Sequence, residues 1–428
     1  MKLSVAVIWA VVTILSQTGA FADSQVPNAD ANSLLALPDY LGYAERNNAA
    51  LKSIFQQFRA AAEQVPQASA LPDPRFTYAY FIDEVETRVG PQRQKFGIMQ
   101  TFPWFGELEA RTDAASAAAK AARKRYEAAK LGLFFKVKES FYEYAYLGRA
   151  VEVARQNLEL LKHFEEVART RYTAAAGSYP DIIRAQIELA TLADKLESIE
   201  QMREPTVAKL NSVLNRESNL PLPWPVRQPL EPVQINRQKV IGKLRANNPE
   251  LKALDFDQAA AESKVELAKK RFYPDVSLGL DWIQTDDARM AGTSDSGKDP
   301  IIAMISVNLP IWGDSYRAGH RQAKARARKV SAQRLQKEND IVAQTAKVLY
   351  EFEDSGRKVA LYADTLISKA KEMLEASEVA YRAGTVDFLS LIDAQRTLLG
   401  FELLGERAVT DYLQRLAELE MLAGGEIE

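Results

Sequence analysis

The sequence has 428 residues, of which 47% are hydrophobic and 26% charged, so the chain can bury a core and is not disordered. Its formal net charge of -2 provides no basic field that would attract nucleic acid. The absence of cysteine excludes disulfides, thiolate metal sites and a lipidated N-terminal cysteine.

Residues 1–22 have the pattern of a cleaved secretory signal. Lys2 precedes an apolar run over 3–15, and Ala20-Phe21-Ala22 forms a small-x-small cleavage site. The alternative is a retained anchor helix, but the apolar run is short for a bilayer, and no later run reaches the ~18 residues that a membrane helix needs. We therefore predict an exported chain that is neither lipidated nor anchored by a helix.

The rest of the chain consists of two copies of one unit. Residues 45–53 recur at 245–253, and 101–106 recur at 308–313. Matches that keep their order along a chain indicate internal duplication. We predict a first repeat over 23–218 and a second over 235–428, joined by a proline-rich, semi-rigid linker over 219–234.

Both copies have the same order of predicted elements. These are a first helix (35–66 and 236–271), a pair of strands, a long helix (107–176 and 314–383) and a return helix (181–218 and 387–424). Gly384 can adopt the left-handed conformation that ends the second long helix. A helix of about 70 residues is roughly 105 Å long, far more than a globular domain needs.

The predicted strands alternate large apolar residues with small or polar ones. One phase holds Phe76, Tyr78, Tyr80 and Ile82 in the first copy and Val276, Leu278, Leu280 and Trp282 in the second. Partner strands are expected near 93–103 and 301–309, after polar loops over 83–92 and 284–299.

A strand of about ten residues suits a tilted membrane strand, and we assign the large apolar phase to lipid. The alternative is a small sheet on a soluble domain. Four strands cannot close a barrel because each spanning backbone group needs a partner. Three chains would supply twelve strands, which is within the range of membrane barrels.

The long helices carry a coiled-coil pattern of apolar residues at steps of three and four. In the first copy the pairs are Tyr144/Leu147, Val151/Ala154 and Leu158/Leu161, and Phe352, Val359 and Leu366 continue the phase in the second copy. The alternative is an ordinary long helical hairpin of the kind found in spectrin-like rods.

The sequence contains no pattern of catalytic or cofactor-binding residues. The only histidines, His163 and His320, lack helically spaced partners that would complete a metal site. There is no phosphate-binding glycine-rich loop and no nucleophile elbow. We therefore predict that the protein is not an enzyme and holds neither cofactor nor metal.

Charged residues cluster at the two breaks between long and return helices. Asp181 and Arg184 in the first copy correspond to a group in the second copy that comprises Ser390, Asp393 and Arg396. Such charges could close the narrow end of a helical tube or form a selectivity ring. The alternative is helix capping, which we favour for Asp387, whereas for Asp393 we favour the pore.

The order of these elements resembles the TolC-like outer-membrane factors of tripartite efflux and type I secretion. Asn-Asn-Pro-Glu-Leu at 247–251 and Tyr-x-x-Gly-Thr at 381–385, followed by Asp-Ala-Gln at 393–395, carry the resemblance, which extends over 35–424. It implies a mainly α fold with membrane β-strands. The homotrimer would form a 12-stranded barrel in the Gram-negative outer membrane and an α-helical periplasmic tunnel.

The resemblance also implies roles for residues at the tips. Asp181 and Asp393 match the tip aspartates of the family, and Ser390 stands where a further acid often sits, which suggests a less acidic aperture. The tip residues Gly177, Ser178, Gly384 and Thr385 resemble the positions that meet the hairpin of a periplasmic adaptor.

We therefore expect an outer-membrane channel that gives small molecules or metal ions passive exit, with an adaptor and an inner-membrane pump as partners. One alternative is the outer-membrane component of type I protein secretion. Another, from a different class, is a periplasmic coiled-coil scaffold or adaptor. The sequence does not indicate which cargo is exported.

Overall fold

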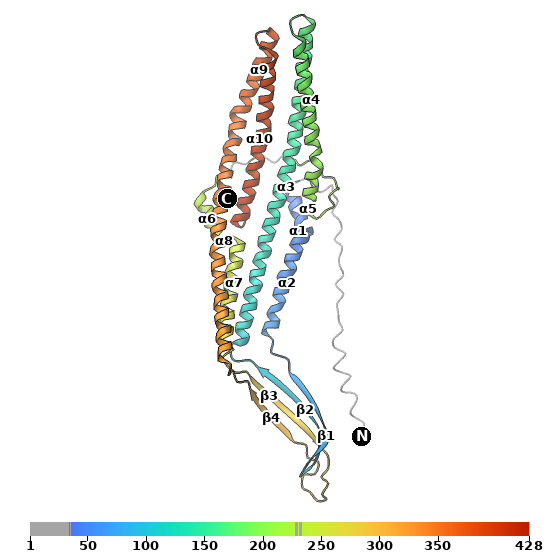
Figure 1. The fold of residues 1–428 in the computed structure, drawn as a ribbon, viewed down its shortest axis with the longest axis vertical. Coiled ribbons are helices and arrows are strands. Elements are labelled where there is room, and N and C mark those ends of the chain that lie inside the picture. The colour runs from blue at the N-terminus through green and yellow to red at the C-terminus, as the bar shows by residue number, and fades with distance from the viewer. Residues whose placement is uncertain (1–33, 35, 227–229, 231–232, 428) are drawn as a thin grey trace.

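The computed structural model describes residues 34, 36–226, 230 and 233–427. The expected signal peptide and part of the expected linker lie outside these residues. The molecule is elongated, with a β-sheet at one end, the tips of two helical hairpins at the other, and the long helices between them (Figure 1). No helix in the described part of the chain is both long and apolar enough to cross a bilayer.

Each first helix is divided in two by an asparagine, where we predicted one continuous helix. The pairs are α1 (Leu37–Asn47) with α2 (Ala49–Ser69), and α6 (Arg237–Asn247) with α7 (Pro249–Lys270). The Asn248 side chain accepts hydrogen bonds from the backbone N–H groups of Glu250 (2.9 Å) and Leu251 (3.1 Å). This cap starts a new helix because it satisfies N–H groups that have no partner within the helix.

The same asparagines connect the ends of different helices. Asn48 Nδ2 donates to the carbonyl of Val213 (2.8 Å) in α5 (Arg203–Leu214), and Asn248 Nδ2 donates to that of Leu422 (2.9 Å) in α10 (Phe388–Ala423). Helix α2 therefore meets the end of α5, and α7 meets the end of α10 (Figure 1). In each repeat the end of the return arm is thus followed by the second part of the first helix.

The long helix of the first repeat, α3 (Glu107–Thr173), is unbroken over 67 residues. Its predicted coiled-coil positions Tyr144, Leu147, Val151, Ala154 and Leu161 are buried. The return helix was predicted as one element but divides at Met202 into α4 (Tyr179–Gln201) and α5. Pro205 explains the division because proline has no N–H to continue the hydrogen-bond pattern, whereas in the first turn of α5 that N–H would have no partner within the helix.

The long helix of the second repeat contains a π-helical turn, Tyr362–Leu366, between α8 (Gly313–Leu361) and α9 (Ile367–Ala383). A π-turn holds one residue more than an α-helical turn. Leu366 was predicted in the buried seam, but the seam instead continues at Ile367, Leu374 and Tyr381. The extra residue has moved the buried stripe by one position.

The sheet in the described residues is antiparallel, in the order β1 (Arg75–Thr87), β2 (Gly90–Phe102), β3 (Val276–Thr285) and β4 (Ile301–Val307). The loop predicted over 83–92 is instead mostly strand, with a turn at 88–89. Gly90, at φ 133°, permits this tight turn. The two repeats meet where β2 pairs with β3.

Candidate functional site at the sheet and the hairpin tips

One face of the sheet is apolar and exposed. The register aligns Tyr78 with Phe96 and Phe96 with Trp282, and their ring centroids lie 5.2 Å and 5.5 Å apart. Most of the residues predicted to face lipid are exposed there, namely Phe76, Tyr78, Tyr80, Ile82, Leu278, Leu280 and Trp282, whereas Val276 is half-buried.

The opposite face of the sheet carries a charged pair. Asp281 is only 4% exposed and lies 2.5 Å from Lys95 Nζ on β2. Gly97 leaves the space for this carboxylate, because a Cβ at that position would overlap Asp281 Oδ1. Thr101 and Ser277 share a hydrogen bond of 2.8 Å. The sheet therefore separates an apolar face from a polar one.

Both outer strands of the sheet have an unpaired edge. Within the described residues, β1 pairs only with β2, and β4 pairs only with β3. An open edge presents a row of unpaired N–H and C=O groups, which is costly wherever water is excluded.

At the other end of the molecule, the two hairpin turns have matching backbone geometry. Gly384 has φ 80°, and the N–H of Thr385 donates to the carbonyl of Ala380 (3.0 Å). In the first repeat Ala175 has φ 56°, and the N–H of Ala176 donates to the carbonyl of Arg171 (2.8 Å). The structural counterpart of Gly384 is thus Ala175 and not the nearby Gly177.

Gly177 has a different role from Gly384. A Cβ on Gly177 would lie 3.0 Å from Arg171 Cβ, so the glycine is required by close packing and not by a positive φ. Ser178 is the N-cap residue of α4, but its side chain makes no capping hydrogen bond.

Tyr381 connects the second hairpin to the first. It is 2% exposed, and its hydroxyl donates to Asp181 Oδ2 (3.2 Å) on α4. Burial, and secondarily the negative charge of Asp181, raises the pKa of Tyr381 to about 12. The hydroxyl therefore keeps its proton and stays a donor at neutral pH.

Arg171 strengthens the same connection. Its guanidinium lies 4.4 Å from the centre of the Tyr381 ring and donates to the Tyr381 carbonyl and to that of Ala176 (2.7 Å). The sequence analysis missed both Arg171 and the role of Tyr381. The Tyr-x-x-Gly-Thr motif marked the turn, but nothing in the sequence indicated which residue it would meet.

Asp387 caps α10, as expected. Its carboxylate accepts hydrogen bonds from the backbone N–H (2.9 Å) and the hydroxyl (2.7 Å) of Ser390. These bonds hold the pKa of Asp387 below its usual range, and the charge of Arg184 adds to the effect. The side chain of Ser390, predicted at the aperture, therefore forms part of a helix cap.

The main partner of Arg396 is Glu188 on α4, which was not predicted. Arg396 Nε lies 3.1 Å from Glu188 Oε2, whereas Asp393 Oδ1 lies 3.8 Å from Arg396 Nη1. Asp393 is 62% exposed at its side chain, so its only ion pair among the described residues is a weak one within α10.

His163 also lies between the hairpins. Its Nε2 is 3.0 Å from Glu378 Oε1 and 3.0 Å from Arg382 Nη2, and both partners are on α9. His163 is exposed, and its side chain therefore joins the surfaces of the two hairpins. The residues that the structure describes contain no group of three or more His, Cys, Asp or Glu arranged to hold a metal ion.

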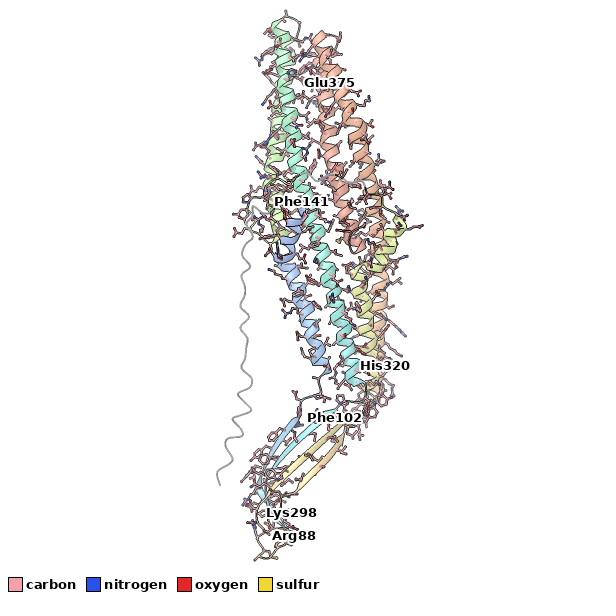
Figure 2. The ribbon with its side chains drawn as sticks, turned by 180° about the vertical axis from the view of Figure 1, so that it is seen from behind. Arg88, Phe102, Phe141, Lys298, His320 and Glu375 are labelled. Carbon is pink, nitrogen blue, oxygen red and sulfur yellow. The ribbon has the colours of Figure 1, made fainter. Side chains whose placement is uncertain are left out.

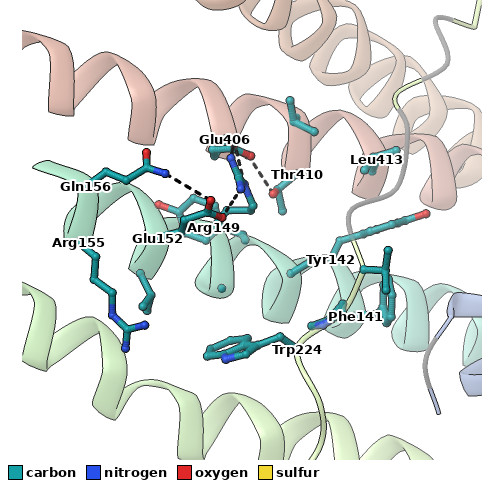
Figure 3. A pocket seen from close by; sticks show the side chains of 17 residues that line it. Phe141, Tyr142, Arg149, Glu152, Arg155, Gln156, Trp224, Glu406, Thr410 and Leu413 are labelled. Carbon is teal, nitrogen blue, oxygen red and sulfur yellow. Dashed lines mark hydrogen bonds and ion pairs between the residues drawn. The ribbon is translucent and has the colours of Figure 1, made fainter. Parts of the chain in front are cut away.

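A cavity of about 390 Å³ lies midway along the molecule, between α3, α10 and the start of the linker (Figure 3). Trp224 stacks on Tyr144 at 4.8 Å, and Gly148 makes room for its ring. Arg149 lies between Glu152 and Glu406 and forms ion pairs with both. These lining charges are therefore paired with one another within the cavity wall.

The comparisons with known proteins agree with this geometry. The family model described as "Outer membrane efflux protein" matches residues 41–216 and 240–425, which correspond to the two structural repeats. The chain belongs to the outer membrane efflux protein family. Its function is accordingly that of the outer-membrane component of an efflux system.

Members of this family differ widely in sequence. Nodulation protein T of Rhizobium leguminosarum bv. trifolii is 22% identical over 85% of this chain and 80% of its own length. Outer membrane protein TolC of Vibrio cholerae is 22% identical over 91% of this chain and 90% of its own length. A crystal structure of CusC matches with a TM-score of 0.76 and 15% identity, over 94% of this chain and 96% of the CusC chain.

Proposed function

We propose that three copies of this chain form a continuous duct from the periplasm to the outside. The open edges of the sheet carry this proposal. If β4 of one copy pairs with β1 of the next, three copies close twelve strands and leave no edge unpaired.

The chemical difference between the two faces of the sheet supports an orientation in which one face meets lipid and the other meets the channel interior. The apolar face with the row Tyr78, Phe96 and Trp282 would contact outer-membrane lipid, and the face with Lys95 and Asp281 would line a water-filled interior. The helices would continue this cylinder as a periplasmic tunnel, after export by a cleaved signal and without lipidation.

The hairpin tips would form the periplasmic aperture. The bonds from Tyr381 to Asp181 and from Arg396 to Glu188 hold the hairpins of one subunit together, which favours a closed resting state. An adaptor joined to an inner-membrane pump would dock at the exposed turns, at Gly177, Ser178, Gly384 and Thr385, and release these bonds. Asp393 and Arg184, both exposed, would lie at the aperture.

The cargo would be selected by the pump and not by this protein. The described residues contain no metal-holding cluster, and the charges that line the cavity near Arg149 are paired with one another. The protein would therefore act as a passive exit for drugs or metal ions, without a cofactor. Export of proteins in a type I system is the second candidate, because the same duct would serve it.

Conductance of the purified protein in a planar bilayer, combined with its mass in detergent, tests this proposal. We expect a threefold assembly with a low-conducting closed state. A chain that stays monomeric and soluble without detergent, and fractionates with the periplasm, would instead support a coiled-coil scaffold.

A further inference from the structure

The first turns of α8 are strongly basic, unlike their counterpart in the first repeat. Residues 314–337 contain eight Lys or Arg and one acid, whereas the equivalent residues 107–130 of α3 contain six and four. Arg317, Arg334 and Lys337 form ion pairs with acids on α8 itself or on α7. The other five cations have no ion-pair partner among the described residues, so intrachain pairing does not account for them.

Four of these cations share one face of the helix. Their spacing of four, three and four residues places them in a line, which we call the basic stripe: Arg317, Arg321, Lys324 and Arg328. All four side chains are exposed. Among the described residues only Arg317 has an ion-pair partner, the exposed Asp314 at 2.7 Å.

A different face of α8 packs against α7. Tyr316, His320 and Ala323 are half-buried, and the ring of Tyr316 lies 5.8 Å from that of Phe272, just after α7. The basic stripe is therefore left free by the packing of α8 within the subunit.

An apolar belt adjoins the basic stripe at the junction between strands and helices. Its members Phe105, Leu309, Ile311 and Trp312 are 84%, 74%, 69% and 73% exposed. Figure 2 shows this junction, with Phe102 at the end of β2 and His320 on α8 close by. Exposed aromatic and large apolar residues at the ends of membrane strands are typical of the membrane interface.

The first two cations of the basic stripe lie close enough to the apolar belt to reach a lipid headgroup layer. At 1.5 Å per residue, Arg317 lies roughly 7 Å and Arg328 roughly 24 Å along the helix from Trp312. The headgroup layer is about 5–8 Å thick on each side of the hydrocarbon, and the field of an anionic surface extends about 8 Å further. Arg317 and Arg321 can thus reach the headgroups, and the other two cations approach the edge of the field.

We propose that the basic stripe and the apolar belt form a binding surface for anionic phospholipid headgroups on the periplasmic side of the membrane. The inference rests on the proposed position of the sheet in the outer membrane. The apolar belt would enter the interface, and the unpaired guanidinium and ammonium groups would bind lipid phosphates.

Lipid binding by the full-length protein in detergent tests this proposal, with phosphatidylglycerol and phosphatidylcholine as probes. The variant Arg321→Gln/Lys324→Gln removes two charges from the stripe. Its matched control, Arg326→Gln/Lys329→Gln, removes two exposed charges from other faces of the same helix, and neither has an ion-pair partner in the part of the chain that the structure describes. We expect the stripe variant to lose affinity for phosphatidylglycerol by about 20-fold and the control by less than about twofold.

Equal losses in the two variants, or equal binding of both lipids by the unaltered protein, would overturn the proposal. The proposal would also be overturned if the stripe variant bound lipid as the unaltered protein does but conducted anions and cations in a different ratio. The stripe would then face the channel interior. Failure of the proposed channel function can be distinguished from failure of the proposed lipid site. Binding of phosphatidylglycerol without a conducting pore would refute the channel and not the lipid site.

Discussion

The hydroxyl of Tyr381 donates a hydrogen bond to Asp181 across the space between the two hairpins of one subunit. The two residues are 200 positions apart in the sequence, and each lies within one turn of a hairpin tip. The bond therefore couples the position of one tip to that of the other.

We expect Tyr381→Phe to raise the conductance of the closed channel, because it removes this bond and keeps the buried ring. The matched control is Tyr172→Phe at the equivalent position of the first hairpin, where the exposed hydroxyl has no hydrogen-bond partner among the described residues. Single-channel recording in planar bilayers measures both. Equal conductance of the two variants would show that the bond does not restrain the tips.

Arg396→Gln should increase leak through the closed channel more than Asp393→Ala does. Arg396 connects α10 to Glu188 on α4, whereas the carboxylate of Asp393 forms an ion pair, among the described residues, only with Arg396 on its own helix. Because Arg396 is 55% exposed, we expect a coupling of no more than about 1 kcal/mol with Glu188 in a double-mutant cycle. A larger leak in Asp393→Ala would instead support a direct role for this acid in the pore.

Deletion of Asp364 should leave the protein folded, because removing one residue from the π-turn converts it to a regular α-helix. The buried stripe on either side would keep its alignment. Deletion of Glu375 is the control, since it would rotate Tyr381 by about 100° relative to Leu374 and expose apolar residues. Thermal unfolding of both variants tests this, and loss of folding on deletion of Asp364 would contradict it.

Asn248→Ala should destabilise the protein by about 1–3 kcal/mol, because it removes a helix cap and leaves the Leu422 carbonyl without its donor. Asn247→Ala, at the exposed neighbouring position, should have little effect. Denaturant unfolding monitored by circular dichroism compares the two variants. Equal stability would mean that the junction between α7 and α10 depends on other contacts.

Gly97→Ala should destabilise the assembled sheet by about 1–3 kcal/mol, because its methyl group would displace the Asp281 carboxylate from Lys95. Gly279→Ala serves as the control, since its Cβ would meet neighbouring atoms at an ordinary 3.4 Å. The temperature at which the oligomer dissociates in detergent is the measurement. A stable Gly97→Ala oligomer would show that the pair can rearrange.

The sequence predicted the duplication, the strand phase and the coiled-coil seam because each rests on a periodic pattern. It failed where one side chain overrides the pattern. Asn248 divides a helix that looks continuous, and Pro205 does so in the return arm. The π-turn was detectable in principle, because Tyr142 and Tyr350 are 208 residues apart, whereas the matching turn residues Ala175 and Gly384 are 209 apart.

The tip residues were only partly predictable. Capping by Asp387 is a local interaction between residues three positions apart, so the sequence was sufficient to predict it. The partners of Tyr381 and Arg396 lie about 200 positions away and depend on how the hairpins pack. No periodicity along a single chain encodes such a contact.

The unpaired edges of β1 and β4 have a consequence for biogenesis. In the proposed duct, a lone subunit could not satisfy these backbone groups in lipid, so the membrane part would mature only as copies meet, and its stability would depend on protein concentration. Until then each edge can template strands from unrelated chains. Factors that keep the exported chain apart from such partners until its own copies are available would therefore favour assembly of the proposed duct.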